Sequence, residues 1–188
     1  ALKHSNVERD ELFITSKLWN DYQGYDQTIE YFNKSLDNLG LDYLDLFLIH
    51  WPCENDQLYI ESYKALEHLY EEGKIKTIGV CNFKIHHLEK LMKETKITPQ
   101  VNQIELHPYF NQQDVQDFCD EHDIKVTAWM PLMRNKGLLD DPVITDIAHR
   151  YDKTPAQIVL RWHLAHNRII IPKSQTPKPV SYTHLTLP

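Results

Sequence analysis

The chain has 188 residues, a formal net charge of −7 and 41% hydrophobic residues, which predicts a single soluble domain with a sizeable core. The acidic balance argues against nucleic acid or an anionic membrane surface as a partner. Its three cysteines, Cys53, Cys81 and Cys119, lack CxxC spacing and are odd in number. We therefore expect a reducing, cytoplasmic location, without a disulfide framework or a metal site.

Short apolar runs, several of them rich in β-branched residues, predict six strands. Their near-continuous hydrophobicity is typical of a parallel sheet that is covered on both faces. The runs occupy residues 12–19, 43–51, 75–81, 100–106, 124–130 and 168–172.

Helical patterns separate these strands. The last two expected helices each begin with a capping residue followed by proline, at Asp141 and at Thr154. The alternation of strands and helices predicts an α/β fold with right-handed crossovers. The other helices are expected within 29–39, 57–72, 84–95 and 112–122, with Gly40 and Gly73 ending the first two.

Two architectures agree with this alternation, a doubly wound sheet and a (β/α)₈ barrel. Doubly wound nucleotide-binding folds carry a glycine-rich phosphate loop after a strand. Only five glycines occur here, and neither GxGxxG nor GxxxxGK[ST] is present. We therefore expect a partial (β/α)₈ barrel, with about six of its eight strands.

Polar and aromatic side chains stand at the expected carboxyl ends of the strands, which share one face of a barrel. A single residue of these types at a strand end is more often structural than functional. Their occurrence at the ends of several strands together favours a functional site. Indoles can stack on a planar ring, amides can bind a carboxamide, and a lysine–serine pair suits a phosphate. The residues are Lys17, Trp19, His50, Trp51, Cys81, Asn82, Gln103, Trp129, Met130, Lys173 and Ser174.

Several stretches together resemble the aldo-keto reductase superfamily, in its branch of small bacterial-type diketogluconate and methylglyoxal reductases. They span residues 1 to about 177 in the family's order. The stretches are "ELFITSKLWN", "SLDNLGLDYLDLFLIHWP", "EEGKIKTIGVCNF", "VNQIELHPY", "AWMPL", "GLLDDP", "KTPAQIVLRWHL" and "IPKS".

The resemblance implies a barrel that uses NADPH to reduce small aldehydes, ketones or keto-sugars by hydride transfer, in a monomeric parent protein. It implies that Lys17 and His50 are catalytic. The lysine lowers the pKa of the family's tyrosine acid, and the histidine orients and polarises the substrate carbonyl. Trp19 and Trp51 match walls of the substrate pocket.

The resemblance also implies a set of cofactor contacts. Asn82 and Gln103 match residues that hold the nicotinamide carboxamide, and Trp129 matches the aromatic residue that stacks on the ring. Lys173 and Ser174 match the pair that meets the 2′-phosphate. The remaining matches are Cys81, Met130 and Leu132, of which the first two replace serines common in the family.

The ends of the chain depart from the family pattern. The family's aspartate and tyrosine precede the lysine strand and have no counterpart here, so we expect residues 1–178 to be an incomplete, inactive barrel. Residues 179–188, "PVSYTHLTLP", resemble a translated sequencing adapter and are expected to be non-native. A non-catalytic, NADPH-binding regulatory subunit of the same fold remains an alternative.

Overall fold

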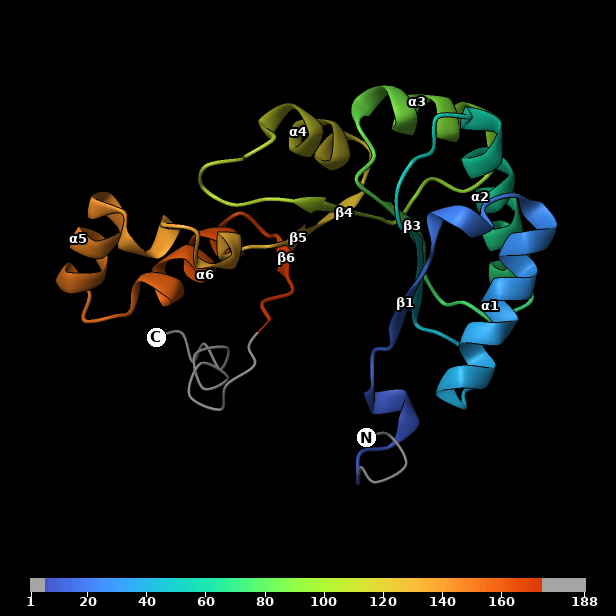
Figure 1. The fold of residues 1–188 in the computed structure, drawn as a ribbon, viewed down its shortest axis with the longest axis horizontal. Helices are drawn as coiled ribbons and strands as arrows, with labels where there is room; N and C mark the ends of the chain where they lie inside the picture. Colours follow the sequence, from blue (N-terminus) through green and yellow to red (C-terminus); the bar gives the residue numbers. More distant parts are fainter. Residues whose placement is uncertain (1–5, 174–188) are drawn as a thin grey trace. The chain divides into compact units, whose positions relative to one another are not determined.

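The computed structural model describes residues 6–173, and the chain divides into two compact units between Asn102 and Gln103. Within these described residues, six parallel strands follow one another in the sheet in chain order (Figure 1). Sequential order is that of a (β/α)₈ barrel, whereas a doubly wound sheet reverses direction partway. The strands are β1 (Thr15–Leu18), β2 (Leu46–Ile49), β3 (Ile78–Cys81), β4 (Val101–Glu105), β5 (Lys125–Trp129) and β6 (Ile169–Ile170).

The expected helices are confirmed, and several begin or end at the predicted signals. Gly40 adopts φ 66° directly after the first helix. The side chain of Asp141 accepts a hydrogen bond from the backbone N–H of Val143 at 2.8 Å, and Thr154 forms a capping box with Gln157. The helices are α1 (Tyr25–Leu39), α2 (Asp56–Glu71), α3 (Ile85–Glu94), α4 (Gln113–Glu121), α5 (Pro142–Arg150) and α6 (Pro155–Ala165).

Short 3₁₀ turns were not predicted, because three-residue turns leave little periodicity in a sequence. They occur at Arg9–Glu11, Asn20–Tyr22, Met133–Asn135 and Leu138–Asp140.

The register of the first three strands decides which side chains share a face of the sheet. Lys17 pairs with Leu48, and Leu48 pairs with Gly79. Paired residues of parallel strands point to the same face, and so do residues two positions further along. His50 and Cys81 therefore lie on the same face as Lys17. The opposite face meets the helices, where Phe47 contacts Phe32 of α1 with ring centroids 5.2 Å apart.

Below these strand ends the first unit is tightly packed. A Cβ atom added to Gly79 would lie 2.4 Å from the carbonyl oxygen of Val101 and 2.9 Å from Cδ2 of Leu48. Only glycine allows the backbones of β3 and β4 to approach this closely. Leu46, Leu48, Cys81 and Val101 form a buried apolar cluster here.

In the second unit, α5 and α6 pack together over a small apolar cluster of Leu138, Ile144 and Val159. Leu132, from the loop after β5, packs against this cluster. The helices thereby hold the loop that follows the carboxyl end of β5.

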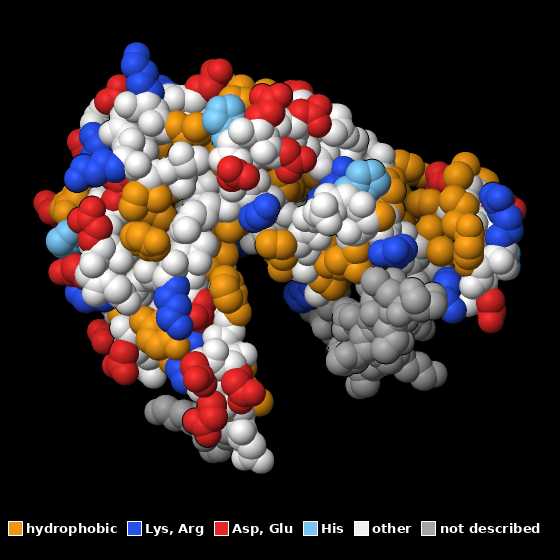
Figure 2. All heavy atoms as spheres, turned by 180° about the vertical axis from the view of Figure 1, so that it is seen from behind, with side chains coloured by type: hydrophobic (Ala, Val, Ile, Leu, Met, Phe, Trp, Pro, Cys, Tyr) orange, Lys and Arg blue, Asp and Glu red, His pale blue; other side chains and the backbone are white. Residues whose placement is uncertain are grey.

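The outer surface carries charges of both signs. On the face shown in Figure 2, acidic and basic side chains are interspersed. Within residues 6–173, no helix combines the length and the apolar character needed to cross a membrane.

Candidate active site

In the first unit, the ends of β1 and β2 bring Lys17, Trp19 and His50 to one edge of the sheet. The indole of Trp19 meets the imidazole of His50 edge-on, with ring centroids 5.2 Å apart and an interplanar angle of 74°. Trp19 is 51% exposed, and Trp51, one residue beyond His50, is 41% exposed. One accessible indole thus meets a half-buried histidine edge-on, and a second accessible indole follows that histidine in the sequence.

The surroundings of His50 favour its neutral form. Burial lowers the pKa of His50, and the nearby charge of Lys17 lowers it further. A neutral imidazole keeps one N–H donor and one acceptor nitrogen. The ring can therefore donate a hydrogen bond to an uncharged oxygen near neutral pH.

The backbone of His50 is held from both neighbouring strands. Its N–H donates to the carbonyl of Leu18 at 3.1 Å, and its carbonyl accepts from Nδ2 of Asn82 at 3.1 Å. Asn82 has φ 64°, in the left-handed region that asparagine tolerates better than most residues. Sequence reasoning assigned Asn82 only to a cofactor and missed this contact.

Cys81 is 1% exposed and lies in the apolar cluster beneath the strand ends. Burial raises the pKa of its thiol to about 12, although the charge of Lys17 acts in the opposite direction. The thiol therefore stays protonated and is no nucleophile. The expected contact between Cys81 and a cofactor stays a prediction. It would require the cofactor to reach a side chain that is nearly inaccessible.

In the second unit, Gln103 on β4 presents a buried acceptor without a partner. The residue is 3% exposed, and its Oε1 makes no hydrogen bond within the described part of the chain. An unsatisfied buried amide oxygen is unfavourable unless a donor completes it. A ligand N–H, such as that of a carboxamide, would fit this position.

The loop after Trp129 has an unusual backbone. Met130, Met133 and Arg134 all adopt left-handed conformations, with φ of 53°, 51° and 49°. Left-handed non-glycine residues are costly and cluster at ligand-binding loops. Nε2 of His163, a fully buried residue of α6, donates to the Pro131 carbonyl at 3.4 Å and so holds the loop.

Sequence reasoning missed the role of His163, because it sits within an ordinary helical pattern. The expected contact of Leu132 with a cofactor stays a prediction. Its side chain packs against the α5–α6 cluster.

The expected residues divide between the two units. Lys173 is exposed shortly after β6, and Ser174 lies outside the described residues. The structure brings together Lys17, Trp19, His50, Trp51, Cys81 and Asn82 in the first unit, and holds Gln103, Trp129, Met130, Leu132 and Lys173 in the second. Among residues 6–173, no group of three or more metal-ligating side chains occurs.

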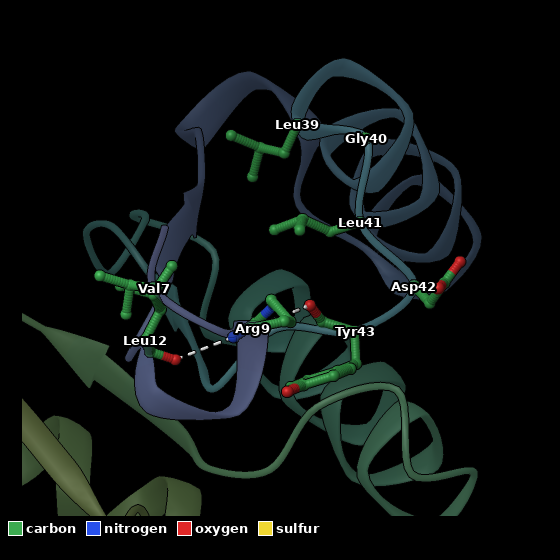
Figure 3. A pocket seen from close by; sticks show the side chains of 8 residues that line it. All are labelled: Val7, Arg9, Leu12, Leu39, Gly40, Leu41, Asp42 and Tyr43. Carbon is green, nitrogen blue, oxygen red and sulfur yellow. Dashed lines mark hydrogen bonds between the residues drawn. The ribbon is translucent and has the colours of Figure 1, made fainter. Parts of the chain in front are cut away.

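A cavity of about 290 Å³ lies at the other end of β1 and β2, at their amino ends (Figure 3). There Arg9 donates to the carbonyls of Leu12 at 2.8 Å and Tyr43 at 3.1 Å, and to the Asp45 carboxylate at 2.8 Å. These contacts attach the segment before β1 to the segment leading into β2. The cavity is therefore a structural junction rather than part of the site around His50.

Sequential parallel strands, with polar and aromatic groups at their carboxyl ends, define a (β/α)₈-type protein whose site is carried by strand ends and the loops after them. The chain belongs to the aldo/keto reductase family, and the sequence model of that family matches residues 1–183.

Two curated relatives are identical to this chain at about half of the aligned positions. The chain is 51% identical over 174 residues to the glyoxal reductase of Bacillus subtilis, a match that covers 93% of this chain and 62% of that protein. It is 49% identical over 182 residues to the methylglyoxal reductase DkgA of Escherichia coli, covering 96% of this chain and 66% of that protein. The chain thus spans somewhat less than two thirds of the length of both relatives.

Solved structures agree with the fold. An aldo/keto reductase from Brucella melitensis matches with a TM-score of 0.92 and 47% identity, covering 96% of this chain and 69% of that one. A mutant of Gox0644 in complex with NADPH matches with a TM-score of 0.89 and 43% identity, covering 96% of this chain and 68% of that one. The fold is therefore a partial (β/α)₈ barrel, as expected from the sequence.

Proposed function

We propose that the protein to which this chain belongs reduces small aldehydes and ketones with NADPH, and that Lys17 and His50 are catalytic. The observation that carries the proposal is the arrangement of Lys17 and Trp19 around His50 at adjoining strand ends. A cation, an imidazole N–H donor and an apolar ring there suit a carbonyl group, because the first two can stabilise the negative charge that its oxygen gains during reduction.

The proposed roles follow from the charge that develops during reduction. As hydride reaches the carbonyl carbon, the C=O π electrons move to the oxygen, and a proton, which the resemblance assigns to the family's tyrosine, completes the alcohol. An N–H of neutral His50 donates to that oxygen and orients it, and the nearby Lys17 cation stabilises the developing charge. The backbone bonds from Leu18 and Asn82 keep the imidazole in place, so that little reorganisation is needed.

NADPH supplies the hydride in this proposal. The cofactor-binding residues are those named from the sequence: Cys81, Asn82, Gln103, Trp129, Met130, Leu132, Lys173 and Ser174. Gln103 gives the clearest support, because its buried Oε1 needs a donor and a carboxamide has one. The NADPH complex of the related Gox0644 supports the same choice.

Small dicarbonyls are the proposed substrate class. The glyoxal reductase of Bacillus subtilis and the methylglyoxal reductase of Escherichia coli support it by their similarity. Trp19 and Trp51, both partly exposed beside His50, would form the apolar walls of a pocket for such compact molecules.

The test is the oxidation of NADPH by the complete protein with methylglyoxal. The loss of NADPH absorbance measures its rate. We expect His50→Ala and Lys17→Met each to lower kcat/KM by about 10²-fold or more, as loss of a preorganised donor does elsewhere. His149→Ala is the matched control, because His149 is exposed on α5.

Wild-type-like turnover in the His50→Ala variant would overturn the assignment of His50. NADPH binding without oxidation for any aldehyde tested would favour the regulatory-subunit alternative instead.

A further inference from the structure

A second cavity, of about 200 Å³, lies wholly within the second unit and plays no part in the proposed reaction. Lys125 is the first residue of β5, and Arg168 directly precedes β6, so the cavity lies at the amino ends of these strands. Trp129 stands at the other end of β5, about 13 Å away at the usual rise per residue. The cavity is lined by Gln116, Asp120, Lys125, Val126, His166, Asn167 and Arg168.

Arg168 is the buried cation of this cavity. It is 5% exposed, and its guanidinium carbon lies 4.4 Å from the ring centroid of Trp162. Nη2 donates to Oδ1 of Asn111 at 3.3 Å. Nε and Nη1 are buried and have no acceptor within residues 6–173. These two atoms carry three of the five N–H donors of a guanidinium.

The buried N–H donors on Nε and Nη1 of Arg168 need a hydrogen-bond acceptor. Arginine stays charged in proteins, so it does not relieve burial by losing its proton. Buried, unpaired donors on a charged group are among the costlier defects in a fold. A group with several acceptor oxygens and negative charge would complete Arg168.

The side chains around the cavity do not provide that acceptor. Nε2 of Gln116 is itself a donor, to the carbonyl of Asn111 at 2.5 Å, and within residues 6–173 neither Nε nor Nη1 of Arg168 donates to Oε1 of Gln116. Asp120 is exposed, and in the described part of the chain no ion pair joins it to Arg168, although its charge opposes the lowering of the Arg168 pKa by burial. Lys125 brings a second cation, so the cavity keeps an excess of positive charge.

We propose that this cavity is a binding site for a small oxyanion, with Arg168 as the buried anchor and Lys125 as the exposed cation. Phosphates and carboxylates share the required chemistry, because both offer charged acceptor oxygens to a guanidinium. The amino-terminal face of a barrel contributes to stability rather than catalysis. The anion would therefore stabilise the folded protein by binding the native state alone.

The experiment is calorimetric titration of the complete protein with inorganic phosphate and, separately, with acetate, at constant ionic strength set by chloride. We expect saturable binding of at least one anion, and the stronger of the two identifies the ligand class. Lys125→Gln should weaken binding about tenfold, the effect of losing one charge-assisted contact. Because Lys125 is exposed, this variant should keep the thermal stability of the wild type in chloride.

Two controls separate this site from others. Lys153→Gln removes an exposed lysine of the same unit outside the cavity and should leave binding unchanged. Lys173→Ala tests whether phosphate binds instead at the proposed cofactor site, and loss of the saturable heat in this variant would assign the anion to that site and overturn the proposal. Arg168→Lys keeps the charge but loses the guanidinium donors, and should abolish saturable binding.

Three further results would overturn the proposal. One is the absence of saturable heat with either anion, and another is unchanged affinity in Lys125→Gln. The third is a crystal structure from phosphate and acetate solutions in which only water contacts Nε and Nη1 of Arg168.

Discussion

The indole of Trp19 lies edge-on to the imidazole of His50, with the ring centroids 5.2 Å apart. Both residues extend the paired register of Lys17 with Leu48 by two positions, so they point to the same face of the sheet as the lysine. Neighbouring strands thereby make an aromatic and cationic surround for one histidine. The effect of the Lys17 charge on the pKa of His50 can be measured directly.

Replacing Lys17 by methionine should raise the pKa of His50. Burial remains the larger cause of the lowered value, but the repulsion between two cations is removed. NMR titration of the His50 ring protons measures the shift.

Lys93→Met, on the exposed side of α3, is the control and should leave the pKa of His50 unchanged. An unaltered His50 titration in Lys17→Met would mean that the lysine charge does not act on the imidazole.

Gly79→Ala should destabilise the fold by about 1–3 kcal/mol or more, as overpacking does. The new methyl group would lie 2.4 Å from the backbone oxygen of Val101, which cannot move without shifting β4. Gly73→Ala is the comparison, because that site has open space and pays only for its φ of +73°. Urea unfolding curves for both variants test this, and equal losses would show that the close approach at Gly79 is unimportant.

Acid should destabilise the protein through His163. Burial lowers the pKa of this imidazole to about 4, and the charges of Arg168, His107 and His166 act in the same direction. The unfolded chain, with an ordinary value near 6.5, binds the proton first, so stability falls as the pH drops from about 6.5 to about 4. The loss should reach about 2–3 kcal/mol across this window.

His163→Gln removes the titrating group and keeps a donor near the Pro131 carbonyl. Its unfolding free energy should depend less on pH in that window than that of the wild type, measured by denaturant unfolding at each pH. His149→Gln, on the surface of α5, should retain the wild-type dependence. A His163→Gln profile that parallels the wild type would contradict the prediction.

Lys173→Ala in the complete protein should weaken NADPH binding about tenfold or more, with little effect on NADH. The proposed partner of Lys173 is the 2′-phosphate, which NADH lacks, and a charge-assisted contact of this kind has that magnitude. Fluorescence titration with each cofactor measures the difference. Equal losses for the two cofactors would count against a phosphate contact.

Residues 1–188 expressed alone should show no reduction of methylglyoxal above background. The resemblance assigns proton donation to a family tyrosine, and we propose that none of the tyrosines in residues 1–188 takes its role. The complete protein, assayed in parallel, is the control. Turnover of the short chain at an ordinary enzyme rate of about 1–10 s⁻¹ would show that the proton donor has been misassigned.

Local signals in the sequence were enough to predict the order of the strands and most of the helix boundaries. Gly40, Asp141 and Thr154 act within a few residues of their own positions, so their effects can be recognised without a structure. The candidate residues at the strand ends were predictable for a related reason. A parallel sheet brings its carboxyl ends to one edge whatever the details of packing.

Contacts between distant segments could only be decided by the tertiary structure. The register that aligns Lys17 with Leu48, the bond from Asn82 to the backbone of His50 and the bond from Arg168 to Asn111 each join residues far apart in the chain. None is encoded in a local pattern, because register and burial arise when whole elements pack. The sequence by itself determined which chemical groups stand at the strand ends. Packing decided which of them are uncharged, which are held by hydrogen bonds and which, within the described residues, are buried without a hydrogen-bond partner.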